Sequence, residues 1–509
     1  MKILLTTLNA RYAHTSLGLR YLYANLGEHQ KNAVICEYTL DQRPIDIVEQ
    51  LLAQEPDVIS LGVYIWNIHQ SEAIAKMIKA VRPDIILIIG GPEVSYEHHL
   101  NAIVDVVDYV ICGWGEASLP KLLSDIENQR RPVNKIIQGI KLPLDDIKFP
   151  YDYYTDTDLA QRILYVEASR GCPFTCEFCI SSLDESVQAF NIDAFLAEME
   201  KLFQRGARTF KFVDRTFNIK LENSKRILQF FLDKIAKYPE EGIFAHFEVV
   251  PDYLPEELRR LIQAFPKGAL QLEIGIQTLN RDVQRNISRR THLGKAKESI
   301  SWLSTQTGAH LHVDLIAGLP GENLASFAKG FNELWSWQPQ EIQLGILKRL
   351  KGTPIVRHTD SFEFVYDELA PFAALKNRDL SFVELQHINR LSRFWDLIIN
   401  SGRFPHTTPL ILGETPFENM WELSDWIFKT TKQTHKIALD RLIKLIFDWL
   451  TSKNLPKQEI ISLLSADFMT MGIQGWPHYL GSPPEGWRAK VNNKGSKGTV
   501  RQDRHMVGN

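Results

Sequence analysis

Residues 163–179 read ILYVEASRGCPFTCEFC and join an apolar, strand-like run to three closely spaced cysteines. The run at 163–168 has the β-branched and apolar composition of a buried strand. Cys172, Cys176 and Cys179 follow with the spacing C-x-x-x-C-x-x-C, so one loop carries three thiols directly after a strand. Pro173 and Gly171 stiffen and shape that loop. The stretch therefore predicts a strand whose carboxyl end presents three thiolate ligands.

Three thiolates on one short loop favour a small inorganic centre. On a cubane iron–sulfur cluster, three cysteines leave one iron open to chelate the amino and carboxylate groups of a substrate. Zinc is the alternative, because thiolate-rich sites also bind it. Structural zinc takes four ligands, and no second cysteine pair follows, so the fourth ligand would come from a residue such as His246 or His312. We therefore predict metal ligation by Cys172, Cys176 and Cys179 and favour the cluster.

Strand-like runs alternate with helical patterns from residue 161 to about 355. The runs cover 163–168, 209–213, 243–249, 270–276, 310–316 and 341–347. Strands that alternate with helices form parallel sheets, and six such units predict a partial (β/α)6 TIM-type barrel. In such barrels the catalytic groups gather at the carboxyl ends of the strands.

The same alternation occupies residues 1–130, with strand-like runs at 2–7, 34–38, 58–64, 85–89 and 109–112. It predicts an α/β fold with an N-terminal Rossmann-like, doubly wound parallel sheet. Residues 131–160, rich in Pro, Asp and Tyr, are expected to form a linker across the surface.

The pattern becomes helical from 375 to 487, most clearly at 382–399, 416–430 and 435–450. Two interpretations fit this helical C-terminal domain, closure of the active site or a module for stability alone. The tail at 488–509 is basic and poor in apolar residues, which predicts a disordered, solvated tail rather than a nucleic-acid arm.

The overall composition excludes several classes of protein. A formal net charge of −3 gives no global attraction to nucleic acid or to anionic membranes. No run approaches the roughly 20 apolar residues of a membrane helix, and the first residues lack the long apolar region of a signal peptide, so we expect a cytoplasmic protein. Five cysteines in 509 residues are too few for a disulfide scaffold, and Cys36 and Cys112 are interpreted as buried structural residues.

With Phe178 before the last cysteine and this domain order, residues 1–350 resemble a radical S-adenosylmethionine enzyme of the subgroup with an N-terminal cobalamin-binding-type domain. The resemblance implies a 4Fe-4S cluster, S-adenosylmethionine and cobalamin as cofactors. In that family the cluster cleaves S-adenosylmethionine to a 5′-deoxyadenosyl radical, while the protein positions the cofactors and excludes water. The implied partners are a small-molecule substrate and a one-electron reductant such as flavodoxin or ferredoxin, with no nucleic acid and no membrane.

The resemblance also implies residues that bind S-adenosylmethionine. Asp214 ends the second barrel strand, where it would hold the methionine amino group or cap the next helix. Glu273 and Gln277 share one face of the fourth strand and suit ribose hydroxyls or substrate. Asp314 lies in the fifth strand, and Gly318 opens the turn GLPGE, which would pack against the adenine.

Cobalamin would lie at the carboxyl ends of the N-terminal strands. The candidate residues there are Asn9, His14, Gly90, Gly91, Gly113 and Gly115. The D-x-H-x-x-G motif that supplies an axial histidine elsewhere is missing, so His14 is either a loop histidine or a cobalt ligand. A domain that keeps the fold without the cofactor is the alternative.

Two basic features have less specific interpretations. Arg170, just before the cysteines, would tune the cluster electrostatically or form a surface ion pair. Lys348, Arg349 and Lys351 would meet an anionic substrate or form a solvated basic turn, and we favour the turn.

Three functions remain open from the sequence. The preferred one is cobalamin-dependent methyl transfer to an unactivated carbon or phosphorus. The second resembles the anaerobic magnesium-protoporphyrin monomethyl ester cyclase. The third is a sensor that binds a cluster and a corrinoid without turnover. The sequence does not identify the substrate, because a fold does not fix a function.

Overall fold

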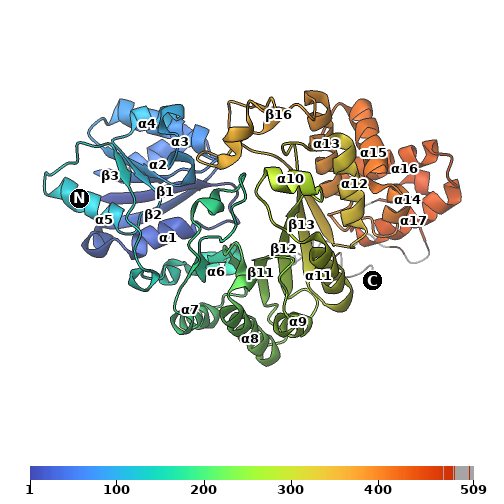
Figure 1. Ribbon diagram of the computed structural model, residues 1–509, viewed down its shortest axis with the longest axis horizontal. Helices are drawn as coiled ribbons and strands as arrows, with labels where there is room; N and C mark the ends of the chain where they lie inside the picture. Colours follow the sequence, from blue (N-terminus) through green and yellow to red (C-terminus); the bar gives the residue numbers. More distant parts are fainter. Residues whose placement is uncertain (474, 485–486, 488–503, 505–509) are drawn as a thin grey trace.

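The computed structural model describes residues 1–473, 475–484, 487 and 504. Along the chain they form a sheet domain, a barrel and a group of helices (Figure 1). Within these residues no helix is both long enough and apolar enough to cross a membrane. The predicted disordered tail at 488–509 lies outside the described residues except for Arg504.

The N-terminal domain is a parallel sheet of six strands in the order β2-β1-β3-β4-β5-β6. The strands are β1 (Ile3–Asn9), β2 (Ala33–Thr39), β3 (Val58–Gly62), β4 (Ile86–Gly90), β5 (Tyr109–Cys112) and β6 (Ile136–Gln138). Helices α2 (Pro44–Leu52), α3 (Ile68–Val81) and α4 (Ala102–Val106) pack on one face, and α1 (Leu17–Ala24) and α5 (Ser118–Glu127) on the other. The predicted doubly wound sheet is confirmed. Because the strand order reverses beside β1, a crevice for ligands is expected at the carboxyl ends of the strands there.

Strand β6 corrects the predicted linker. It pairs with β5 in parallel, so the sheet domain extends into the range predicted as linker, 131–160. Only three residues long and flanked by Pro132 and Pro143, it is too short for a recognisable strand pattern. The same range ends in α6 (Asp156–Gln161), whose Asp158 pairs with Arg20 of α1.

The central domain is a parallel sheet of six strands in the order β14-β13-β12-β11-β10-β7. The strands are β7 (Leu164–Val166), β10 (Thr209–Phe212), β11 (Phe244–Val249), β12 (Leu270–Gln277), β13 (His310–Ala317) and β14 (Glu341–Ile346). Its helices are α7 (Ile192–Gln204), α8 (Leu221–Lys237), α9 (Glu256–Gln263), α10 (Arg281–Asn286), α11 (Leu293–Gln306) and α12 (Leu324–Trp335). In the described part of the chain β14 does not pair with β7, so the barrel is open, as predicted.

The C-terminal helices cover the open edge of the barrel. They are α13 (Phe382–Ile398), α14 (Thr408–Leu412), α15 (Pro416–Thr431), α16 (Leu439–Ser452) and α17 (Lys457–Thr470), preceded by the small ladder of β15 (Val365–Tyr366) and β16 (Ala374–Lys376). The side chain of Asn400 accepts from the Ile342 N–H (3.1 Å) and donates to its carbonyl (2.9 Å), and Ser392 donates to the Leu344 carbonyl. These contacts satisfy backbone groups that an edge strand leaves open. Because the helices share one apolar core with the barrel, they stabilise it from this side.

The turn after β14 joins the barrel to the N-terminal domain. Lys351, predicted in a solvated basic turn, is buried, and its Nζ lies 2.7 Å from Oε1 of Glu93. Arg349 pairs with Glu97 at 2.8 Å. The preference for a solvated turn is therefore wrong for Lys351, because its partners come from a loop about 250 residues earlier in the chain.

Candidate active site

The cysteine loop is fixed at both of its ends. The two-residue strands β8 (Ser169–Arg170) and β9 (Gln188–Ala189) pair in antiparallel fashion around it. The Cys172 N–H donates to the Asp184 carbonyl at 2.9 Å. Gly171 has φ +89°, and a Cβ there would lie 1.8 Å from the Ser186 carbonyl oxygen, so only glycine fits. The loop therefore projects from the carboxyl end of β7 in one defined path.

Cys172, Cys176 and Cys179 line one cavity of about 210 Å³ at the barrel mouth. Burial raises the pKa of the Cys172 and Cys176 thiols, and the charge of Arg289 opposes that shift. Nη1 of Arg289 donates to Sγ of Cys176 at 3.4 Å. Thiolates are the metal-binding form of cysteine, so the partly buried cation of Arg289 beside them favours ligation.

Polar groups from two further barrel strands face the same cavity. Glu273 and Gln277 of β12 and Asp314 of β13 line it with the cysteines. Gln277 has φ +70° beside an irregularity in the β12–β13 register. Among the described residues, neither Oε1 of Gln277 nor Oδ1 of Asp314 has a hydrogen-bond partner, although both atoms are buried. Buried polar atoms rarely lack partners, and strained backbone concentrates at functional sites, so both observations fit a polar ligand held here.

The two carboxyl groups in this cavity have opposite protonation tendencies. Burial alone would raise the pKa of Glu273, but the contact with His246 at 3.1 Å and the charge of Lys211 outweigh it and hold the pKa at about 2. Burial, together with the charges of Glu273 and Glu248, raises the pKa of Asp314 well above its usual value. Glu273 is thus an ionised acceptor, whereas Asp314 favours the neutral form, which also donates a hydrogen bond.

The zinc alternative finds no support in the described residues. No group of three or more His, Cys, Asp or Glu side chains there is close enough to hold a single metal ion. His246 contacts Glu273, and His312 lies 3.7 Å from Asp314. Neither histidine lines the cavity of the cysteines.

Two residues predicted for S-adenosylmethionine lie outside this cavity. Asp214 is buried beneath the loop, where it accepts from the Ala168 N–H (3.0 Å) and the Ser169 hydroxyl (2.5 Å). Burial raises its pKa to about 7. The carbonyl of Gly318 accepts from Asn377, so this glycine packs toward the helical domain. Asp214 therefore holds the start of the cysteine loop.

Several lining residues were not predicted from the sequence. Arg289, Arg290 and Thr291 follow α10 in a segment with no recognised motif. For these three, the basic run in SRRTH was the only available signal, and it does not distinguish a site from a solvated turn. Arg215 and Glu248, by contrast, lie where the sequence predicts the ends of the second and third barrel strands, and they line the cavity and pair at 2.7 Å.

A second cavity, of about 350 Å³, lies at the carboxyl ends of β3, β4 and β5 in the N-terminal domain. Gly90, Gly91, Gly113 and Gly115, the four glycines predicted to bind cobalamin, line this cavity. A Cβ on Gly91 would lie 2.4 Å from the Val63 carbonyl oxygen, whereas one on Gly113 would meet nothing within 4 Å. The first glycine lets the backbone turn, and the second leaves space for a ligand. The cavity fits a nucleotide-sized tail rather than a whole corrinoid, given its volume.

Asn9 and His14, also predicted for cobalamin, do not line this cavity. Asn9 donates to Glu37 and to the His14 carbonyl. Nδ1 of His14 lies 2.7 Å from the Tyr165 hydroxyl of β7, and burial followed by the charge of Lys211 lowers the histidine pKa. The structure thus places His14 at the barrel wall.

Arg170 lines the N-terminal cavity and stands at the start of the cysteine loop. Its guanidinium lines the N-terminal cavity, and its backbone lies two residues before Cys172. It pairs with Glu116 at 2.7 Å and Glu167 at 2.9 Å and stacks 4.7 Å from the Trp114 ring. Of the two interpretations from sequence, the ion pair is present, but it is largely buried.

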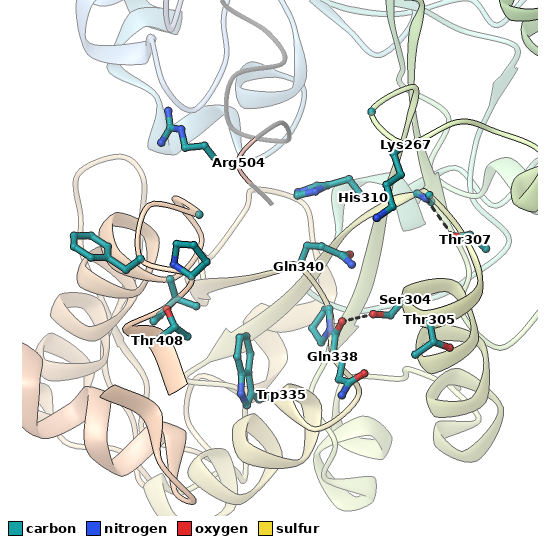
Figure 2. Close-up of a pocket in the computed structure, with 18 of the residues that line it drawn as sticks. Lys267, Ser304, Thr305, Thr307, His310, Trp335, Gln338, Gln340, Thr408 and Arg504 are labelled. Carbon is teal, nitrogen blue, oxygen red and sulfur yellow. Dashed lines mark hydrogen bonds between the residues drawn. The ribbon is translucent and has the colours of Figure 1, made fainter. Parts of the chain in front are cut away.

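A larger cavity, of about 650 Å³, opens at the other end of the barrel (Figure 2). His310, Gln338 and Gln340 point into it from the amino-terminal sides of β13 and β14. Ser304 donates to the Gln338 carbonyl at 2.5 Å. No cysteine lines this cavity, and this end of a barrel serves stability rather than catalysis. The active site is therefore assigned to the smaller cavity at the mouth.

The domains match known families. The B12 binding domain family matches residues 3–123, and the Radical SAM superfamily matches residues 166–334. Residues 360–498 match a protein of unknown function, DUF4080.

The relatives agree with these matches. The chain is 24% identical over 252 residues to an uncharacterised methyltransferase of Pyrococcus horikoshii, which covers 45% of this chain and 53% of that protein. It is 21% identical over 348 residues to the anaerobic magnesium-protoporphyrin IX monomethyl ester cyclase of Cereibacter sphaeroides, covering 63% and 56%. The chain thus spans about half the length of these curated relatives. The cobalamin-dependent S-adenosylmethionine radical enzyme OxsB shares the fold, with a TM-score of 0.61, 15% identity, and coverage of 92% of this chain and 78% of that one.

Residues 166–334 therefore form a radical S-adenosylmethionine domain. A B12 binding domain, residues 3–123, precedes it in the chain. The predicted class, a radical S-adenosylmethionine enzyme, is confirmed, as are the cofactors that these domains imply, a 4Fe-4S cluster, S-adenosylmethionine and cobalamin. The roles of individual residues stay predictions.

Proposed function

We propose that the chain is a cobalamin-dependent radical enzyme that transfers a methyl group from S-adenosylmethionine to an unactivated centre of a small molecule. The observation that carries this proposal is the presence of two cavities at carboxyl strand ends, one lined by three cysteines and the other by four glycines and Arg170. When bound, the cluster supplies the electron that cleaves S-adenosylmethionine, and cobalamin carries the methyl group.

The residues of the chain have separate roles in this proposal. The three cysteines would hold the cluster, with Arg289 as a donor to one thiolate. Glu273 would accept hydrogen bonds from S-adenosylmethionine, and neutral Asp314 would donate one. Phe174 and Phe178 line the same cavity and would limit the access of water, which strengthens the polar contacts within it.

The experiment is anaerobic reconstitution of the full chain with iron, sulfide and hydroxocobalamin, followed by reduction with dithionite in the presence of S-adenosylmethionine. We expect iron and sulfide in cluster proportion and release of 5′-deoxyadenosine. Cys172→Ala, Cys176→Ala and Cys179→Ala should each abolish both. Cys36→Ala and Cys112→Ala are matched controls and should retain both, because these cysteines lie in the N-terminal sheet. One zinc with no iron, or a full cluster that never releases 5′-deoxyadenosine, would refute the proposal, the latter in favour of a sensor.

The cyclase is the second candidate, because the Cereibacter sphaeroides relative matches 63% of this chain. Methyl-labelled S-adenosylmethionine distinguishes the two when the enzyme is incubated with a small-molecule extract of its native host. Methyl transfer predicts label in a new product and binding of hydroxocobalamin. Cyclisation predicts a changed product with all label left in methionine.

A further inference from the structure

Residues 281–297 form an unusually basic segment beside the cysteine loop. The sequence RDVQRNISRRTHLGKAK contains six arginines and lysines and a single acidic residue, in a chain whose formal net charge is −3. Five of these cations are exposed: Arg281, Arg285, Arg290, Lys295 and Lys297. Clustered charge of one sign creates a local potential that the net charge of the chain does not reveal.

Most of this charge is not neutralised by neighbouring carboxylates. Asp282 pairs with Arg285, and nearby Glu298 pairs with Arg259. Among the ion pairs of the described residues, none involves Arg281, Arg290, Lys295 or Lys297. The segment therefore offers several free cations to an approaching partner.

The same segment contacts the cysteine loop directly. The Glu177 N–H donates to the Ile287 carbonyl at 3.0 Å, and Ser288 donates to the Glu177 carboxylate at 2.5 Å. Arg289 reaches Cys176, and Arg290 lines the cavity of the cysteines. Figure 1 shows α10, which begins the segment, at the ends of β12 and β13. The basic surface is thus continuous with the wall of the proposed cluster site.

One further cation extends this surface. Arg357 contacts the same Glu177 carboxylate, and its side chain is 60% exposed. We call the six exposed cations, Arg281, Arg285, Arg290, Lys295, Lys297 and Arg357, the basic rim. Arg357 and Ser288 both contact the carboxylate of Glu177, which lies between Cys176 and Cys179 in the cysteine loop.

We propose that the basic rim is the docking surface of an acidic one-electron-transfer protein that reduces the cluster. This inference rests on the proposed function, because a cluster held by these cysteines needs one electron per cleavage. In the step the donor protein loses one electron and the cluster gains it, with no bond made or broken between the proteins. Redox encounters of this kind bury little surface and depend on charge complementarity, so a rim of exposed cations beside the cluster suits them.

The test compares reduction by a flavodoxin of net negative charge with reduction by dithionite. The variant is Arg281→Glu/Lys295→Glu/Lys297→Glu, which leaves untouched every residue that lines the cavity or contacts the cysteine loop. The control is Lys31→Glu/Lys121→Glu/Arg130→Glu, which reverses three exposed cations of the N-terminal domain and changes the net charge equally. The readouts are the rate of cluster bleaching after mixing with reduced flavodoxin and the affinity of flavodoxin for the chain, both at low and high salt.

At low salt we expect the rim variant to bind flavodoxin at least about tenfold more weakly than the wild type, and to be reduced by it at least about tenfold more slowly. High salt should remove most of the difference, since it screens exposed charges. Dithionite should reduce the wild type and both variants at equal rates. Failure of dithionite to yield 5′-deoxyadenosine would refute the proposed function, and the affinity measurement would still judge the docking surface.

Three results would overturn the docking proposal. Equal flavodoxin rates and affinities in the rim variant and the wild type would exclude the rim, and an equal loss in the control would reduce the effect to net charge. A polynucleotide that binds the wild type and not the rim variant, with flavodoxin reduction unchanged, would assign the surface to nucleic acid instead.

Discussion

Substitution of Lys351 by methionine should loosen the N-terminal domain from the barrel. Lys351 and Glu93 form an ion pair of 2.7 Å with side chains only 4% and 3% exposed. Methionine keeps the length and apolar stem of lysine but removes the cation, so a buried carboxylate loses its charged partner. Breaking a buried pair from one side costs about 3–5 kcal/mol. At roughly 2–4 °C per kcal/mol for a unit of this size, the first thermal transition should fall by about 6–20 °C.

The pH dependence of this loss has a defined sign. Burial raises the pKa of Glu93, and Lys351 opposes the shift, so its removal raises the pKa further. A carboxyl group with a raised pKa binds more protons in the folded state, and its contribution to stability is lost as pH rises through that pKa. The variant should therefore lose more stability at pH 8 than at pH 5, where Glu93 escapes the cost by protonation.

The assay is differential scanning calorimetry of four proteins, the wild type, Lys351→Met, Glu93→Gln and the double variant. Replacing both charges removes the uncompensated carboxylate, so the double variant should regain most of the loss. Lys348→Met is the matched control, because Lys348 is exposed and should change the transition little. A Lys351→Met transition equal to that of the wild type would refute the reasoning, as would a double variant no more stable than Lys351→Met.

Three further predictions concern the two cavities and the buried carboxyl group beneath the cysteine loop. Arg289→Gln removes a charged hydrogen-bond donor to the Cys176 thiolate, so one-electron reduction of the cluster should become about tenfold less favourable. In an electrochemical titration followed by electron paramagnetic resonance, the reduction potential of the cluster should fall by ~59 mV, and an unchanged potential would contradict the prediction. Gly91→Ala, at φ +112° and against the Val63 carbonyl, should weaken hydroxocobalamin binding at least about tenfold in a spectroscopic titration, whereas Gly206→Ala, at φ +104° and in open space, should not. Burial raises the pKa of Asp214 to about 7, so its carboxyl group holds a proton more tightly in the folded state than in the unfolded state. The free energy of unfolding of the wild type should therefore fall from about pH 4 to pH 7, by at most about 1.4 kcal/mol per pH unit. Asp214→Asn should flatten this pH dependence in thermal scans, and an unchanged pH dependence would contradict the assignment.

The strands of both sheets were predictable because they are locally coded. The run 85–89 is continuously apolar, as in a strand buried on both faces, and the run 310–316 alternates polar and apolar residues, which also predicts a strand. Strand β6 was missed because three residues are too few to show a repeating pattern of apolar and polar side chains, and the strand forms through its pairing with β5. The cysteine loop was predictable for a similar reason, since all three thiols and the glycine that shapes it lie within nine residues.

The rest of the site depends on contacts between distant segments. Arg289 meets Cys176 across 113 residues, and nothing in its own sequence context distinguishes it from Arg290 beside it. His14 lies in the predicted loop yet turns to Tyr165, because that loop also bridges to Ile163 at the start of the barrel. Lys351 was expected in solvent because a charged side chain is almost never buried unless it is paired, and its partner could not be read locally.

Buried ion pairs join the N-terminal domain to the rest of the chain at three places, beside an apolar cluster in which Tyr21 stacks on Phe190. Arg170 pairs with Glu116, Lys351 with Glu93, and Arg20 with Asp158. Such pairs add little net stability, because desolvation offsets most of their attraction, but they tolerate few alternative geometries. Domains within one chain otherwise move relative to one another by default. We therefore infer that these pairs fix the orientation of the N-terminal domain on the barrel, and with it the relative orientation of the two cavities. The Lys351→Met/Glu93→Gln protein separates the two effects, since it should regain thermal stability while hydroxocobalamin and S-adenosylmethionine lose any influence on each other's affinity; if that coupling persists unchanged, orientation is set elsewhere in the interface.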